Sequence, residues 1–229
     1  MPTFVLLPGL HGTDDLYADL AHALAPQGRS IAIAYPTDRP LGYPDLVAQV
    51  LAAWPTDGDV VLVAESFSGP VALMLAAQRP RGLRAVVLSA TFARNPSPWL
   101  RPLRFVLPFA SKHWMPTAVA AALMLGESAT REWAATIARI LDRVSDTALR
   151  ARATAAFDVD VRGLIPTIDV PLLYLRARHD RLIAARHGDD IVARARDGRL
   201  VDIDSPHLIF QIAPREAAAA IDDFLRWKR

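Results

Sequence analysis

The chain has 229 residues, 52% of them apolar, which is enough for one domain of ordinary size with a packed core. It contains no cysteine, and this excludes disulfide bonds, thiolate catalysis and cysteine-ligated zinc. The formal net charge is only +2 and the arginines are scattered rather than clustered, so the composition gives no indication of nucleic-acid binding.

The pattern of apolar residues gives no indication of a membrane protein. No uninterrupted apolar run reaches the ~18 residues that a membrane-spanning helix needs. The first residues also lack the basic start and the long apolar run of a signal peptide. We therefore expect a cytoplasmic protein with no membrane span.

Short apolar runs alternate with amphipathic segments along the chain. Strands are predicted at Thr3–Leu7, Ser30–Tyr35, Asp59–Ala64, Arg84–Ala90, Pro171–Ala177 and Leu200–Ile203. Helices are predicted at Asp15–Ala25, Pro44–Trp54, Phe67–Gln78, Ala184–Ala195 and Pro214–Trp227. The strands are apolar without alternation, as expected for parallel strands that are covered on both faces. The order predicts an α/β fold with a sheet of about six strands, mostly or wholly parallel, Thr3–Leu7 inside it and Ser30–Tyr35 at one edge.

A long stretch between the predicted strands Arg84–Ala90 and Pro171–Ala177 breaks this alternation. Its second part, Thr117–Phe157, is rich in alanine and helical in pattern, and connections in α/β proteins are usually much shorter. We assign residues 93–159 to a helical cap over the C-terminal edge of the sheet, where open α/β folds bind ligands. Residues 1–92 and 160–229 then form the core. The alternative is a helical pair with a purely structural role.

The sharpest motif is Ala64-Glu65-Ser66-Phe67-Ser68-Gly69, at the junction of a buried strand and a helix. A serine at such a junction, with small residues two positions before and after it, is typical of a nucleophile elbow. Glycine is usual at both flanking positions, and here Ala64 and Ser68 meet the same demand for a small side chain. Two alternatives remain open: Ser66 is a helix N-cap, or Ser68 is the nucleophile.

A serine hydroxyl needs a neighbouring base, and the base needs an orienting carboxylate. Of the six histidines, His207 alone falls between the last predicted strand and the last predicted helix, where the base of a nucleophile-elbow enzyme belongs. Asp180 follows the preceding strand and fits the acid in the order serine, acid, histidine. Asp204, close to His207 in sequence, is the alternative acid, and a turn aspartate or a surface histidine is the non-catalytic alternative.

Acyl transfer also requires two N–H donors for the negative charge that develops on the carbonyl oxygen. The residue after the nucleophile, Phe67, supplies one backbone donor in this arrangement. The loop after the first strand supplies the other, and aligning the strand ends points to Leu10. Gly9 and Gly12 let the backbone of this loop fold back towards the site. The loop has neither of the glycine spacings of nucleotide-binding motifs, so a nucleotide cofactor is not expected.

Together the loop Pro8–Thr13, the turn at Ser66, Asp180 and His207 resemble the α/β-hydrolase superfamily across the whole chain except the cap. Within it, the segments Leu6–Thr13 and Ala64–Pro70 look most like a proteobacterial branch of hydrolases. They also look somewhat like the esterase/acyltransferase domain of plant phytyl ester synthases. The resemblance implies hydrolysis of an ester or thioester through an acyl-enzyme, with no metal and no cofactor. It does not identify the substrate, because the fold hosts many activities.

Other activities of the superfamily remain as alternatives. An acyltransferase uses the same triad and passes the acyl group to an alcohol. C–C bond hydrolases and hydroxynitrile lyases also keep the serine, whereas Ser66 argues against dehalogenases and epoxide hydrolases, which use aspartate. A ligand-binding relative without catalysis is the non-enzymatic alternative.

The predicted cap is rich in large apolar residues. They are Trp99, Leu100, Leu103, Phe105, Val106, Leu107, Phe109, Trp114, Met115, Leu123, Met124 and Leu125. Part of this set is expected to line a pocket for an apolar acyl or alcohol group of a small-molecule ester or thioester, although ordinary packing explains such a set equally well. Arg94, Arg101 and Arg104 near the cap entrance suggest contact with a carboxylate or an anionic acyl carrier.

Overall fold

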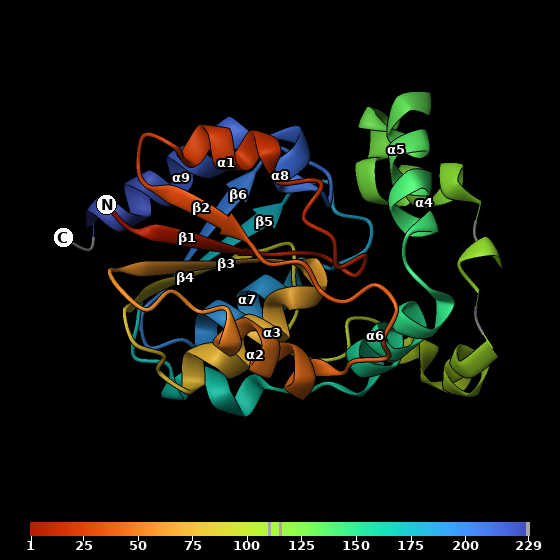
Figure 1. Cartoon of the computed structure of the whole chain (residues 1–229), viewed down its shortest axis with the longest axis horizontal. Coiled ribbons are helices and arrows are strands. Elements are labelled where there is room, and N and C mark those ends of the chain that lie inside the picture. Colours follow the sequence, from red (N-terminus) through yellow and green to blue (C-terminus); the bar gives the residue numbers. More distant parts are fainter. Residues whose placement is uncertain (110, 115, 228–229) are drawn as a thin grey trace.

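The computed structural model describes residues 1–109, 111–114 and 116–227 of the chain. Its centre is a six-stranded sheet in the order β2-β1-β3-β4-β5-β6, in which every adjacent pair is parallel (Figure 1). The strands are β1 (Thr3–Leu7), β2 (Arg29–Ala32), β3 (Val60–Glu65), β4 (Leu83–Ser89), β5 (Leu172–Ala177) and β6 (Gly198–Ile203). The predicted parallel sheet is confirmed, with β1 inside it and β2 at one edge.

Helices cover both faces of this sheet (Figure 1). One face carries α2 (Tyr43–Ala52), α3 (Gly69–Ala77) and α7 (Arg186–Arg194), and the other carries α1 (Ala18–Leu24), α8 (Ile209–Ile212) and α9 (Pro214–Trp227). Successive side chains of a strand point to opposite faces, so β3 sends Leu62 into the first core and Val61 and Val63 into the second. This is why the strand reads as an unbroken apolar run.

Most element boundaries lie within two residues of the sequence prediction, and two differ by three. Strand β2 ends at Ala32 rather than Tyr35, because its neighbour β1 leaves the sheet after Leu7. The Tyr35 N–H instead donates to the Gly12 carbonyl in the loop that follows β1, at 2.7 Å. Helix α1 begins at Ala18 rather than Asp15, because the residues before it form a turn whose Tyr17 hydroxyl donates to the Leu7 carbonyl.

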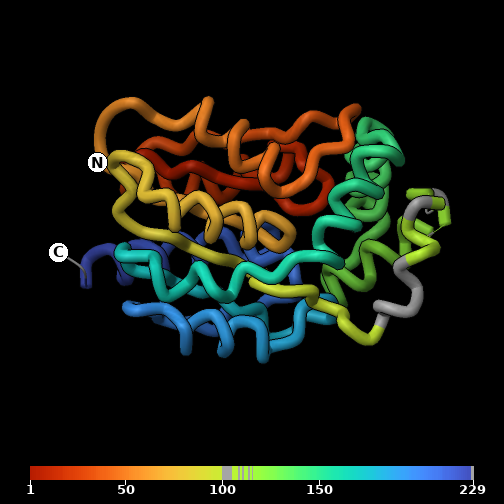
Figure 2. Tube along the Cα trace, turned by 90° about the horizontal axis from the view of Figure 1, so that it is seen from below, coloured from red at the N-terminus to blue at the C-terminus, as the bar shows by residue number. Residues whose placement is uncertain are grey.

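Most of the segment between β4 and β5 is helical and lies beyond the C-terminal ends of the strands (Figures 1 and 2). Its last turn, Arg162–Thr167, instead packs against α3 and α7. Its main helices are α4 (Thr117–Leu125), α5 (Arg131–Asp142) and α6 (Asp146–Asp158). The Thr130 hydroxyl caps α5 by accepting the Trp133 N–H, and the Ser145 hydroxyl caps α6 by accepting the Ala148 N–H. We keep the name cap for these three helices and the turns before them.

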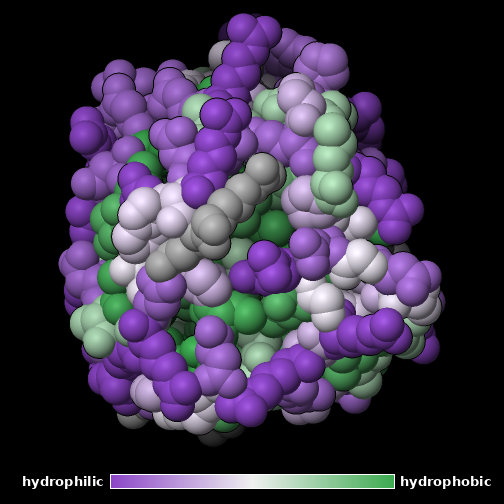
Figure 3. Space-filling view, turned by 90° about the vertical axis from the view of Figure 1, so that its left-hand side faces the viewer, coloured by the Kyte–Doolittle hydropathy of each residue, from purple (hydrophilic) through white to green (hydrophobic). Residues whose placement is uncertain are grey.

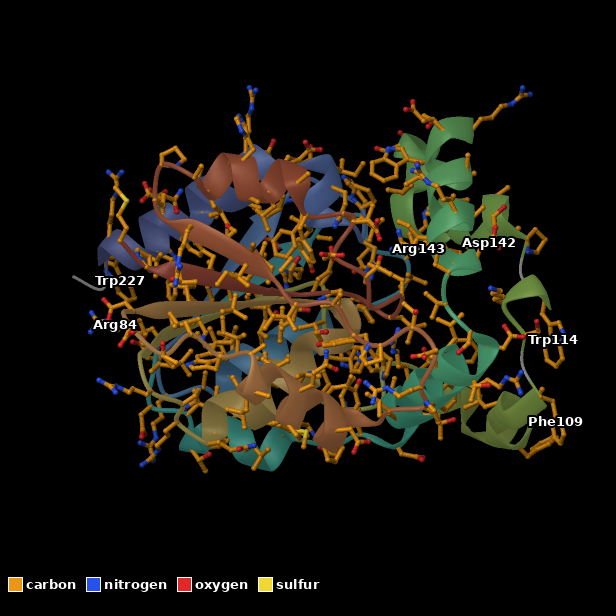
Figure 4. The ribbon with its side chains drawn as sticks, in the orientation of Figure 1. Arg84, Phe109, Trp114, Asp142, Arg143 and Trp227 are labelled. Carbon is orange, nitrogen blue, oxygen red and sulfur yellow. The ribbon has the colours of Figure 1, made fainter. Side chains whose placement is uncertain are left out.

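Specific contacts fix the cap to the core. Arg143 lies at the end of α5 (Figure 4) and forms an ion pair with Asp15. The Ser145 N–H donates to the Thr37 carbonyl at 2.8 Å. Within the cap, the Lys112 ammonium donates to the Leu141 carbonyl at 2.9 Å, where its charge complements the C-terminal end of α5. These contacts hold the α5–α6 corner of the cap against the loops of the sheet.

The other end of the molecule, where both termini lie, presents mostly hydrophilic residues with apolar residues visible in its middle (Figure 3). In the described part of the chain, no helix combines the length and the apolar character needed to cross a bilayer.

Candidate active site

Ser66 lies on a tight turn between β3 and α3. Its φ of 49° is in the left-handed region, which costs a non-glycine residue about 1–3 kcal/mol and is typical of functional sites. The residue does not cap a helix, because α3 takes Ser68 as its N-cap residue, and the short 3₁₀ turn Ser66–Ser68 takes Glu65. The Thr91 hydroxyl donates to the Ser66 carbonyl and holds the turn in this conformation.

Two loops at the same edge of the sheet bring His207 and Asp180 to Ser66. His207 Nε2 lies 2.9 Å from the Ser66 hydroxyl oxygen, and His207 Nδ1 lies 2.8 Å from Asp180 Oδ2. The side chains of His207 and Asp180 are only 4% and 5% exposed. Because a carboxylate oxygen accepts, Nδ1 carries the ring proton, and Nε2 is free to accept the proton of the serine.

The position of Asp180 is itself fixed by the backbone. Its Oδ1 atom accepts the N–H groups of Leu182 at 2.8 Å and Ile183 at 2.9 Å. The carboxylate therefore cannot rotate without losing two hydrogen bonds, and its other oxygen is held towards His207. This anchoring sets the plane of the imidazole ring relative to Ser66.

The alternative nucleophile and acid lie elsewhere. The Ser68 hydroxyl is fully buried, donates to the Pro8 carbonyl and lies 2.6 Å from the Tyr35 hydroxyl. Asp204 is 71% exposed and pairs with His179 at 2.8 Å. The structure thus brings Ser66, His207 and Asp180 together and leaves Ser68 and Asp204 in other contacts.

The loop that follows β1 runs beside Ser66. A Cβ atom built on Gly9 would lie 3.9 Å from the Ser66 Cβ atom, so this part of the loop closely approaches the serine. Among the described residues, no protein acceptor is found for the backbone N–H of Leu10 or of Phe67. These are the two groups that the sequence predicts for an oxyanion hole. The Phe67 side chain is buried and stacks on Tyr43 with ring centroids 4.8 Å apart.

A cavity of about 480 Å³ adjoins Ser66 and His207, within the usual size range of small-molecule pockets. Most of its wall is apolar and comes from the cap and from the loops after β5 and β6. The apolar residues of the cap that line it include Leu123, Met124, Ile137, Ile140, Leu149 and Ala153. Polar groups lie at the serine, at Glu65, and among cap residues such as Lys112 and Asp146.

Only part of the predicted apolar set faces this cavity. Leu123 and Met124 line it, whereas Leu125 is buried in cap packing. Trp99, Phe105, Phe109 and Trp114 are 60% to 74% exposed, and the labelled Phe109 and Trp114 lie on the outer side of the cap (Figure 4). The side chains of Leu100, Arg101, Leu103 and Arg104, and Met115 as a whole, lie outside the described part. Arg94 is exposed at the base of the cap, beside Asp160.

The sequence analysis did not single out three charged or titratable residues near the site, which are Glu65, His11 and Arg152. Glu65 is 1% exposed, and burial raises its pKa to about 7, with the neighbouring His207 and Gln211 acting in the opposite direction. Burial lowers the pKa of His11 to about 4, and the positive charge of Arg152 adds to this. Glu65 was visible in the sequence as a carboxylate that ends an otherwise apolar strand, but nothing local distinguished Arg152 from the other arginines.

Comparison with known proteins places the fold in a structural class. No protein-family model matches the chain. The structure is similar to a hydrolase from Oleispira antarctica, with a TM-score of 0.85, 14% identity, and coverage of 99% of this chain and 91% of that one. It is also similar to the enol-lactonase from Burkholderia xenovorans, with a TM-score of 0.82, 22% identity, and coverage of 98% and 91%. A third similar structure is the esterase from Exiguobacterium antarcticum, with a TM-score of 0.83, 15% identity, and coverage of 99% of this chain and 92% of that one. The chain has the α/β-hydrolase fold.

One curated protein is similar in sequence. The polyketide synthase ThaQ from Burkholderia thailandensis is 27% identical over an alignment of 236 positions, which covers 91% of this chain. The alignment spans only 11% of the length of ThaQ. The likeness therefore concerns one short part of a much longer protein.

Proposed function

We propose that this protein is a serine hydrolase that cleaves a carboxylic ester or thioester through an acyl-enzyme. The observation that carries the proposal is the single imidazole of His207, placed between the Ser66 hydroxyl at 2.9 Å and the Asp180 carboxylate at 2.8 Å. Both distances are within the reach that proton transfer requires. The strained turn at Ser66 and the adjoining cavity support the same conclusion.

In the proposed mechanism the Ser66 oxygen attacks the carbonyl carbon while His207 Nε2 takes its proton. The N–H groups of Leu10 and Phe67 stabilise the negative charge on the carbonyl oxygen. His207 then gives the proton to the leaving alcohol or thiol. A water molecule attacks the acyl-enzyme with His207 again as the base, which releases the acid and restores Ser66. Asp180 holds the imidazole in the required tautomer throughout.

The lining of the cavity supports an apolar acyl or alcohol group. Side chains such as Leu123, Met124 and Ile140 offer contact area without hydrogen bonds, whereas the polar groups of the reaction gather at Ser66. Small to medium esters and thioesters are therefore the first substrates to test.

The proposal predicts that Ser66→Ala loses covalent reactivity and activity together. Wild-type protein treated with a fluorophosphonate probe is expected to gain the mass of one adduct, and Ser66→Ala none. Hydrolysis of p-nitrophenyl esters is expected to fall at least about 10⁴-fold in the variant, because the nucleophile is lost. Intact-mass spectrometry and initial rates provide the two measurements.

Ser30→Ala is the matched control, because Ser30 lies on the edge strand β2, away from the site. The Ser30→Ala variant should take up one fluorophosphonate adduct and hydrolyse p-nitrophenyl esters at the rate of the wild type. A wild-type protein that is folded but takes up no adduct and cleaves no ester would contradict the proposal and favour the ligand-binding alternative. Acyl transfer to an added alcohol in preference to water would favour the acyltransferase.

The apolar cavity predicts a specific change in chain-length preference. Ala153, on α6, lines the cavity, and Ala153→Phe would occupy part of it. We expect kcat/KM for a p-nitrophenyl ester with a long acyl chain to fall at least about tenfold, and that for the acetate to change much less. The control is Ala135→Phe on the exposed side of α5. An equal loss for both esters would mean that the acyl chain lies elsewhere.

A further inference from the structure

Arg152 is a buried cation with no acidic partner among the described residues. It projects from α6 of the cap into the core and is 0% exposed. Its guanidinium donates to three backbone carbonyls: Leu10 at 2.9 Å, His11 at 2.8 Å and Pro36 at 2.7 Å. It also lies over the ring of Tyr35, 5.7 Å from the centroid. A buried charge is costly, and this one is compensated by carbonyl oxygens and an aromatic face.

Two of those carbonyls belong to the loop beside Ser66, and the remaining carbonyls of that loop are also hydrogen-bonded. The Ser68 hydroxyl donates to Pro8, and the Gly12 N–H donates to Gly9 at 3.0 Å. Every carbonyl from Pro8 to His11 therefore has a donor. Because a peptide unit is planar and its N–H points away from its C=O, fixing these carbonyls also fixes the direction of the N–H groups between them.

The sequence of the loop is adapted to this contact. Gly12 has a φ of 75°, which favours glycine. A Cβ atom there would also lie 2.3 Å from Arg152 Nη1, too close for any side chain. Glycine at position 12 thus gives the guanidinium access to the loop. The lowered pKa of His11, to about 4, is a second sign that burial and the Arg152 charge act on this loop.

We propose that Arg152 is a positioning residue, through which cap helix α6 holds the loop after β1 with the Leu10 N–H directed at the carbonyl oxygen of the substrate. This rests on the proposed function. Ser68 holds the same loop from the core side, through Pro8. The cap then completes the oxyanion hole as well as covering the cavity, and its positive charge favours the oxyanion of the transition state over the neutral ester.

The test compares Arg152→Met, Arg152→Lys and the control Arg139→Met on the substrate that the wild type cleaves best. Methionine keeps much of the apolar volume and removes every donor, whereas lysine keeps the charge with one donor group. Arg139 lies exposed on α5 of the cap, outside the cavity. Thermal unfolding and circular dichroism establish that each variant is folded, and kcat, KM and the rate of fluorophosphonate labelling are then measured.

For Arg152→Met we expect kcat to fall about 100-fold and KM to stay within about twofold, because an interaction specific to the transition state is weakened. Arg152→Lys should lie between this variant and the wild type, and Arg139→Met should match the wild type. Labelling should slow in the same order. An unchanged kcat in folded Arg152→Met, or a loss confined to KM, would overturn the proposal, since a merely structural cap contact would produce either result.

If Arg152→Met does not fold, Arg152→Lys and Ser68→Ala test the proposal in its place. Arg152→Lys weakens the contacts to the Leu10 and His11 carbonyls, and Ser68→Ala removes the contact to the Pro8 carbonyl. Both should lower kcat at nearly constant KM, and wild-type values of kcat in both would overturn the proposal. Failure of the proposed function gives a different result: the wild type itself would take up no fluorophosphonate. A labelled wild type with equally labelled, equally active Arg152 variants would overturn the positioning role alone.

Discussion

Substitution of Asp180 by Asn is expected to lower kcat about 10⁴-fold with little change in KM. The asparagine oxygen should stay on the side of the Leu182 and Ile183 N–H groups, which now fix Oδ1. The amide NH₂ would then face His207 Nδ1, in place of Oδ2. A donor at that position forces Nδ1 to accept, so the ring proton moves to Nε2. His207 can then no longer take the proton of Ser66.

Initial rates with a p-nitrophenyl ester measure this effect, and Asp204→Asn is the matched control. Asp204 follows β6 near His207 in sequence, but its pair with His179 is exposed, and such pairs contribute little. We expect the control to keep kcat within about twofold. A large loss in Asp204→Asn, or a small one in Asp180→Asn, would contradict the assignment of Asp180 as the orienting acid.

Substitution of Glu65 by Gln is expected to stabilise the fold at neutral and alkaline pH. Burial raises the pKa of this carboxyl from 4.5 to about 7 in the folded chain. Between these two values the unfolded chain has already lost its proton and the folded chain retains it. The free energy of unfolding therefore falls as the pH rises through this range. The shift corresponds to at most about 3 kcal/mol, and glutamine removes it because it carries no charge.

Thermal unfolding at pH 5 and pH 8 tests this prediction. At pH 8 we expect the Tm of Glu65→Gln to exceed that of the wild type by about 4–10 °C, and at pH 5 the difference should nearly vanish. Glu216→Gln, on the exposed side of α9, is the control and should differ from the wild type by at most about 0.5 kcal/mol at either pH. A Glu65→Gln variant that is no more stable than the wild type at pH 8 would show that Glu65 ionises without penalty.

Much of the fold was predictable because its signals are local. Runs such as Thr3–Leu7 and Val60–Ala64 are apolar on both faces, and short runs of this kind are typical of parallel strands that are covered on both faces. The loops after β5 and β6 follow from the strand positions, so the sequence alone places Asp180 and His207 at one edge of the sheet. Boundaries such as the end of β2 could not be predicted, because they depend on where the neighbouring strand stops.

The sequence by itself determined the parallel sheet, its alternation with helices, and the edge at which a serine, an acid and a histidine were expected. Only the tertiary structure separated Ser66 and Asp180 from the alternatives Ser68 and Asp204, and showed which residues surround the group. Arg152 looks like any other helical arginine until α6 packs on the loop after β1, and Glu65 looks like any strand-end carboxylate until Gln211 and Tyr17 enclose it. The burial of a side chain and its hydrogen-bond partners depend on segments that are distant in the chain. Strand patterns and motifs depend only on neighbouring residues. The sequence alone therefore determines the strands and the motif, whereas the surroundings of the site require the fold.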